Sequence, residues 1–163
     1  MKTTTLLAVA FMLMSAVTAD AKKKQSVWPD GTAMDQWFGD TAKVDVAALG
    51  KQYVITDYGV KNDSALLQTE AIQKVIDTAA ANGGGVVVVP KGTFFTGSLF
   101  FRPGTHLHMA EGSRLKGSDA ITHYKIVKTR LEGQTLNYFA ALINANGVDG
   151  FTITGRGTID GNG

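Results

Sequence analysis

The sequence has no cysteine and only three histidines among its 163 residues. The absence of cysteine excludes a disulfide framework and thiol catalysis. Charged residues make up 18% of the chain and the formal net charge is +2, which is too small to predict a nucleic-acid or membrane partner. The 44% share of hydrophobic residues is enough to bury a core. We therefore expect one folded domain of ordinary size.

The N-terminus contains an apolar run that is well short of the roughly 20 residues a membrane-spanning helix needs. Its three parts are typical of a secretory signal peptide. Lys2 is the basic start, residues 6–14 are apolar, and Ala19-Asp20-Ala21 is a small-x-small cleavage site. We expect residues 1–21 to be a signal peptide. The protein is then exported from a bacterial cell, to the periplasm or the extracellular space.

Residues 22–52 are expected to be an N-terminal arm that begins with a solvated basic flank. Aromatic residues gather in it at Trp28, Trp37 and Phe38. Tryptophans could stack on sugar rings, but the simpler interpretation is that they tether the arm to the domain, and we favour it.

The strongest helical pattern begins at residue 69. Apolar residues recur there at the spacing of one helix face, namely Ile72, Val75, Ile76, Ala79 and Ala80. Thr69 is expected to be the N-cap. Asn82 and Gly83 supply a stop, since a left-handed residue usually ends a helix. The sequence therefore predicts an α-helix near residues 69–82.

The glycine-rich remainder predicts many short strands. The run at residues 86–89 has no polar alternation, which indicates a strand buried on both faces in a parallel arrangement. Further strands are expected at residues 51–58, which a turn at 59–63 follows, and at 93–96, 98–101, 105–109 and 114–116. A helix ahead of stacked short strands fits a parallel β-helix with an N-terminal capping helix. An α/β sandwich with one helix on a sheet is the alternative.

Residues 118–138 are more polar and less regular, and such an excursion from a solenoid often lies on its binding face. Short strands are expected again within 139–144, 148–154 and 158–160, and Asn146-Gly147 makes a local hairpin possible. A β-helix that stopped at Gly163 would have an uncapped apolar end. We therefore expect residues 53–163 to be the N-terminal part of a longer, truncated β-helix domain.

Several short motifs follow one another in the order of a known family, although each alone would be weak. They are Tyr58-Gly59-Val60, TEAIQ at 69–73, GGGVVVVP at 83–90, GTF at 92–94, TGSL at 96–99, LKGS at 115–118 and GRGTIDGNG at 155–163. Residues 53–163 thus resemble the N-terminal part of the polygalacturonases, glycoside hydrolase family 28. The resemblance implies an all-β, right-handed parallel β-helix. It also implies inverting hydrolysis of α-1,4 links in galacturonan, with no metal cofactor.

Inverting hydrolysis needs a carboxylic acid and a carboxylate about 6.5–9.5 Å apart. The family places them in an Asn-Thr-Asp motif and an Asp-Asp pair, near a Gly-His-Gly and an Arg-Ile-Lys. This sequence contains none of the four. The similar Arg114-Leu115-Lys116 occupies a structural turn of the family. We therefore assign no catalytic, substrate-binding or metal-binding residue. The hypothesis is that the complete protein is the enzyme and that this chain alone is inactive.

The remaining polar candidates have simpler interpretations. Asp149 and Asp160 each precede a glycine, as turn-forming aspartates do. His106 and His108 share one strand face and could bind a metal, but no third ligand is near in the sequence. Other candidates are in the irregular excursion, namely His123, Arg130 and Tyr138. An arginine can bind a galacturonate carboxylate, although a loop tied down by an Arg–Glu contact is the simpler interpretation.

Two further readings remain beside a secreted pectin-degrading hydrolase. One is a β-helix polysaccharide lyase, often calcium-dependent, and the other is a non-catalytic β-helix adhesin or polysaccharide-binding protein. The expected partner is a pectic polysaccharide, either galacturonan or rhamnogalacturonan, with no nucleic acid or membrane partner. The complete protein is expected to be a monomer. The sequence does not decide between endo and exo action.

Overall fold

The computed structural model describes residues 26–35, 38 and 44–163. The predicted signal peptide at residues 1–21, the basic flank at 22–25 and Trp37 lie outside the described residues. The chain forms two compact units, residues 1–42 and 43–163. No helix within the described ranges is long and apolar enough to cross a bilayer.

The described part of the first unit is a short turn. Val27 and Ala33 form an isolated antiparallel bridge, and the backbone N–H of Trp28 donates to the carbonyl of Thr32. The ring of Trp28 lies edge-on to Phe38, with centroids 5.1 Å apart. Trp28 thus has an aromatic partner within its own unit and stays 40% exposed.

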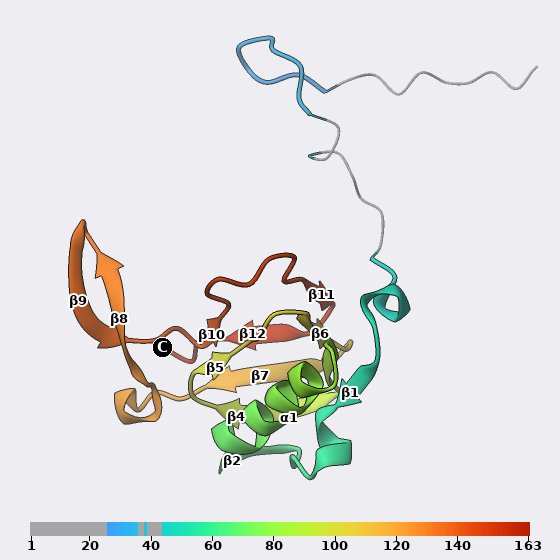
Figure 1. Ribbon diagram of the computed structural model, residues 1–163, viewed down its shortest axis with the longest axis vertical. Coiled ribbons are helices and arrows are strands. Elements are labelled where there is room, and N and C mark those ends of the chain that lie inside the picture. The colour runs from blue at the N-terminus through green and yellow to red at the C-terminus, as the bar shows by residue number, and fades with distance from the viewer. Residues whose placement is uncertain (1–25, 36–37, 39–43) are drawn as a thin grey trace, which may run out of the picture. The chain divides into compact units, whose positions relative to one another are not determined.

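The second unit is a right-handed parallel β-helix, as predicted, and its strands repeat coil by coil in three parallel sheets (Figure 1). The β3 sheet contains, in spatial order, β1 (Gln52–Val54), β3 (Gly85–Val89), β6 (Thr105–Met109) and β11 (Ile153–Gly155). The β4 sheet contains β2 (Asp63–Leu67), β4 (Gly92–Thr96), β7 (Ser113–Gly117) and β12 (Thr158–Asp160). The β5 sheet contains β5 (Leu99–Phe100) and β10 (Ile143–Asn144).

The core is built from side chains that stack between equivalent positions of successive coils. Tyr53 pairs with Val87, and Val87 pairs with Leu107. On the β4 sheet Phe94 pairs with Leu115. All five side chains are buried. Because the register places apolar residues in line, each coil covers the apolar surface of the preceding one, which is the main stabilising term.

Strand β3 is buried along its whole length, as its unbroken valine run predicts. Val87 and Val89 belong to the core. Val86 and Val88 point to the other side of the sheet, where the short 3₁₀ helix η2 (Val46–Leu49) packs against β3. A strand covered on both sides needs no polar alternation.

The helix α1 (Thr69–Ala81) packs against β3 and β5, and Figure 1 shows it in front of the sheets. Its buried residues have the predicted spacing, and the predicted stop is confirmed, since Asn82 is the C-cap residue and Gly83 is left-handed at φ 89°. The N-cap prediction was wrong. Gln68 is the N-cap residue, and the Thr69 hydroxyl instead accepts a hydrogen bond from the N–H of Gly97 at 2.6 Å.

The first coil departs from the sequence predictions in two places. The strand expected at residues 51–58 ends at Val54, because the 3₁₀ helix η3 (Ile55–Tyr58) follows it. Strand β2 was not predicted at all. Every residue of β2 is exposed, so its sequence lacks the apolar pattern by which strands are recognised.

The excursion at residues 118–138 contains regular structure, contrary to the loop expected there. After the 3₁₀ helix η4 (Ile121–His123), β8 (Ile126–Leu131) and β9 (Gln134–Phe139) form an antiparallel hairpin. We call β8 and β9 the ribbon; it projects from the stacked sheets in Figure 1. Glu132 and Gly133 both have positive φ, at 47° and 81°, as a two-residue hairpin turn requires.

The hairpin considered at Asn146-Gly147 does not form. The strands on either side, β10 and β11, pair instead in parallel with β5 and β6 of the preceding coil. Strands β11 and β12 are the last strands of their sheets. Their apolar residues Ile153 and Ile159 are 49% and 41% exposed, although they continue the buried rows of Leu107 and Leu115.

Candidate functional site

Asp160 is held in an ion pair by Arg114, a residue 46 positions earlier in the chain. Nε of Arg114 lies 2.9 Å from Oδ2 of Asp160 and its Nη2 contacts the same oxygen. The other carboxylate oxygen accepts a hydrogen bond from the N–H of Asn162 at 3.0 Å. The arginine hydrogen bond and then the Asn162 N–H hold the pKa of Asp160 below its usual value. A carboxylate so held is a poor general acid, and its place is structural.

Asp149 is exposed in a turn in which Gly150 has φ 70°. This arrangement agrees with the turn-forming interpretation of the sequence. Of the two candidate acids, Asp149 therefore lies in a turn, whereas Asp160 is the last residue of strand β12 and is already paired with Arg114.

His106 and His108 lie on one face of β6, as predicted, and point away from the core. Their register partners on β3 are Val86 and Val88. Nδ1 of His108 is hydrogen-bonded to the hydroxyl of Thr154 at 2.9 Å. Among the described residues, no group of three or more His, Cys, Asp and Glu side chains is placed to hold a metal ion. The hydrogen-bonded interpretation of His108 is the one that fits.

Two residues just before the ribbon, His123 and Tyr124, tie it to Ser118 and Gly97. Nδ1 of His123 is 2.6 Å from the hydroxyl oxygen of Ser118, and the Tyr124 hydroxyl donates to the Ser118 carbonyl at 2.8 Å. Partial burial raises the pKa of Tyr124 above its usual value. The carbonyl of His123 approaches Gly97 so closely that an added Cβ would lie 1.9 Å from it. His123 is thus part of a structural junction.

Arg130 and Tyr138 lie on opposite faces of the ribbon. Residues that are directly paired across an antiparallel ladder share a face, and Arg130 pairs with Thr135 whereas Tyr138 pairs with Val127. Within the described part of the chain, Arg130 makes no ion pair, so the Arg–Glu contact expected to tie down this loop is absent. The sequence analysis identified Arg130 as a candidate but did not predict the strand β8 in which it lies.

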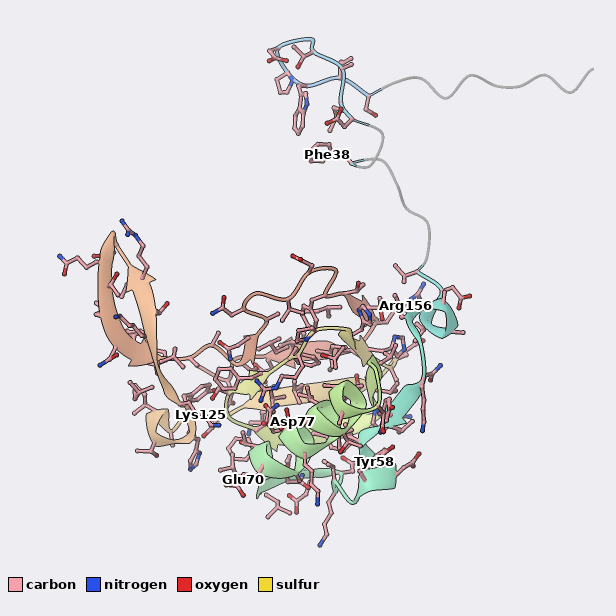
Figure 2. The ribbon with its side chains drawn as sticks, in the orientation of Figure 1. Phe38, Tyr58, Glu70, Asp77, Lys125 and Arg156 are labelled. Carbon is pink, nitrogen blue, oxygen red and sulfur yellow. The ribbon has the colours of Figure 1, made fainter. Side chains whose placement is uncertain are left out.

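Two open grooves are present on the second unit. One, of about 480 Å³, runs along α1 and is lined by Glu70, Lys74, Asp77 and Lys125 among others; Figure 2 labels three of these. Asp77 already binds Nε of Arg102 at 2.9 Å. The side chains of this groove carry both positive and negative charges. Since Asp77 is paired with Arg102, Glu70 has no second free carboxylate beside it among the described residues of this lining to form an acid–base pair.

The second groove, of about 540 Å³, lies between the segment before η2 and the ends of β6 and β11. Its polar lining includes His108, Glu111, Thr154 and Arg156. Figure 2 labels Arg156 at this end of the β3 sheet. His108 and Thr154 bind each other there, and Glu111 is the only carboxylate in the described part of this lining. As in the first groove, no pair of carboxylates suited to catalysis is evident.

Comparison with known proteins agrees with the fold. Residues 53–108 match the family described as "Rhamnogalacturonase A/epimerase, pectate lyase-like". The chain is 35% identical over 147 residues to an exo-poly-alpha-D-galacturonosidase of Dickeya chrysanthemi, which covers 85% of this chain and 24% of that protein. The chain therefore spans about a quarter of the length of that relative.

Two solved structures are similar in both fold and sequence. The exopolygalacturonase of Thermotoga maritima has a TM-score of 0.63 and 28% identity over 68% of this chain and 25% of that chain. The family 28 exopolygalacturonase of Yersinia enterocolitica has a TM-score of 0.62 and 31% identity over 69% of this chain and 21% of that chain. The resemblance to the family 28 polygalacturonases predicted from the sequence is thereby confirmed.

Proposed function

We propose that this chain is the first part of an exported pectin-degrading glycoside hydrolase. The reaction is inverting hydrolysis of α-1,4 links in a galacturonan, and the substrate is a pectic polysaccharide. The observation that carries the proposal is the 35% identity to an exo-poly-alpha-D-galacturonosidase across 85% of the chain. The two similar solved structures are also exopolygalacturonases, so release of sugars from chain ends is the expected mode.

In this proposal the 163 residues supply support and not chemistry. Helix α1 and the 3₁₀ helix η3 pack on the first coils, and the β-helix continues the rows on which catalytic carboxylates would stand. The acid and the base, about 6.5–9.5 Å apart in an inverting enzyme, are not assigned to any residue of this chain. A stacked β-helix suits such a pair, because neighbouring coils are about 4.8 Å apart and alternate residues of a strand about 6.6 Å apart.

Export is part of the same proposal. A pectic polysaccharide is a large extracellular polymer, and residues 1–21 have the basic start, apolar run and small-x-small site of a signal peptide. We place the mature protein in the periplasm or outside a bacterial cell. N-terminal sequencing of the protein secreted by its own host should begin at Lys22, and an intact Met1 would contradict export by this route.

The activity is tested with the product of the complete gene that encodes these residues. Incubation with polygalacturonate should release short saturated uronides and new reducing ends, with no need for calcium. Short products from the start indicate action on chain ends, whereas a broad ladder of sizes indicates internal cutting. Unsaturated, ultraviolet-absorbing products that require calcium would identify a lyase. Binding without any cleavage would identify a non-catalytic protein, and either result would overturn the proposal.

A further inference from the structure

The two faces of the ribbon differ in composition and in exposure. Side chains of directly paired residues share a face. Val127, Thr129 and Leu136 lie on one face and are partly buried. All the residues between the turn and the base on the other face are exposed, and we call them the basic face: Ile126, Lys128, Arg130, Thr135, Asn137 and Phe139.

The basic face carries two cations and no carboxylate. Lys128 and Arg130 are two positions apart on β8, so their side chains leave the strand about 6.8 Å apart. Neither side chain makes a hydrogen bond or an ion pair with another described residue. Two arginines of the coils differ in this respect, because Arg102 binds Asp77 and Arg114 binds Asp160. The cations of the ribbon are therefore free to bind an external anion.

The neighbours of these cations suit an acidic sugar. Asn137 lies opposite Lys128, and Thr135 lies opposite Arg130, so hydrogen-bonding groups stand beside each cation. Phe139 lies at the base of the same face and is 36% exposed. Although Tyr138 leaves the strand on the other face, its ring turns toward that of Phe139, with centroids 4.2 Å apart, and Tyr124 lies edge-on at 6.5 Å, so only the remaining exposed part of the Phe139 ring is open to a ligand. An exposed aromatic ring can pack on the apolar face of a sugar, while a guanidinium can pair with a carboxylate through two hydrogen bonds.

We propose that the basic face of the ribbon binds an acidic polysaccharide, a run of uronate residues whose carboxylates pair with Arg130 and Lys128. The choice of polysaccharide among anionic polymers rests on the proposed function. The surface itself is defined by exposed side chains and two unpaired cations on one face of the ribbon. It lies on the projecting ribbon, whose base adjoins the groove along α1 at Lys125, and would hold the polymer beside the coils.

The test measures binding of the 163-residue chain to polygalacturonate by affinity electrophoresis and by titration with defined oligogalacturonates. The double variant Lys128→Gln/Arg130→Gln should raise the dissociation constant by about tenfold. The control Lys61→Gln/Lys91→Gln removes the same charge from exposed positions of the coils and should change it by about twofold at most. Arg130→Lys keeps the charge but loses the planar fork and should give an intermediate loss.

Highly methyl-esterified pectin, which has the same sugars without the charge, should bind much more weakly. Absence of binding by the parent chain would overturn the proposal, as would equal losses in the two double variants. Tighter binding of a DNA oligonucleotide than of an oligogalacturonate of equal charge would assign the surface to another polyanion. These outcomes are separate from the hydrolase proposal, which fails only if the complete gene product does not cleave its substrate.

Discussion

The side-chain amide of Gln73 on α1 makes hydrogen bonds to both backbone groups of Phe100 on β5. Its Oε1 accepts from the N–H of Phe100 at 2.8 Å, and its Nε2 donates to the carbonyl of Phe100 at 2.8 Å. On its other side β5 pairs with β10. The amide thus takes the place that a strand of the first coil would occupy, where the chain has a helix instead.

Gln73→Ala should therefore destabilise the second unit. The substitution leaves the partly buried N–H and carbonyl of Phe100 without their side-chain partner, and an unsatisfied group costs up to about 1–3 kcal/mol when it is buried. We expect the free energy of unfolding in urea to fall by that amount. Lys74→Ala is the matched control, since Lys74 is exposed on the same helix and alanine favours helix at least as much as lysine does. Equal losses in the two variants would contradict the structural role of the amide.

Gly97→Ala should also destabilise the protein, through a steric clash. The added Cβ would lie 1.9 Å from the carbonyl oxygen of His123, and forcing such a contact apart typically costs about 1–3 kcal/mol. Gly161→Ala is the control, because an added Cβ at Gly161 has no atom within 4 Å. Thermal unfolding followed by circular dichroism distinguishes them. An unchanged midpoint for Gly97→Ala would show that the junction at His123 can move.

The ion pair between Arg114 and Asp160 should be visible in the titration of the carboxyl. Arg114→Gln should raise the pKa of Asp160 toward its usual value, but only part of the way, because the N–H of Asn162 still lowers it. Two-dimensional NMR of the side-chain carboxyl measures this shift. Arg102→Gln, which breaks the ion pair with Asp77 instead, should leave the Asp160 pKa unchanged.

The lowered pKa of Asp160 makes the stability of the folded protein depend on pH. A carboxyl whose pKa is lower in the folded state contributes stability above its unfolded pKa, and that contribution is lost as the pH falls through the folded pKa. The parent protein should therefore lose more stability than Asp160→Asn on acidification below the usual carboxyl range. Parallel stability curves for the two proteins would contradict a role for this ion pair in acid unfolding.

The 163-residue chain by itself should not hydrolyse galacturonan. It has no Asn-Thr-Asp, Asp-Asp or Gly-His-Gly motif, and of its two candidate acids Asp160 is held by Arg114 while Asp149 lies in an exposed turn. The measurement is release of reducing ends from polygalacturonate, with a characterised exopolygalacturonase as the positive control. Release that survives repurification and disappears in Asp149→Asn would show that the chain carries a catalytic carboxylate after all.

The sequence was most informative where one pattern had one structural solution. The unbroken valine run became the buried strand β3, and the helical spacing became the buried face of α1. The glycines marked both ends of β4 and β7, and the start of β6, to within one residue. It was least informative where the strands are exposed. The residues of β2 lack an apolar pattern, and the ribbon has a Glu-Gly turn in place of the Asn-Gly that signals a hairpin.

The sequence by itself thus determined the kind of elements, because local spacing and glycine positions act within a few residues. Tertiary structure decided which residues meet. Residue 85 pairs with residue 105, whereas residue 107 pairs with residue 153, because the ribbon lies within the second of these coils. Coils of unequal length have no fixed repeat in the sequence. Contacts such as Arg114 with Asp160 and Gln73 with Phe100 therefore depend on the register in which each coil packs on the apolar surface of the preceding one.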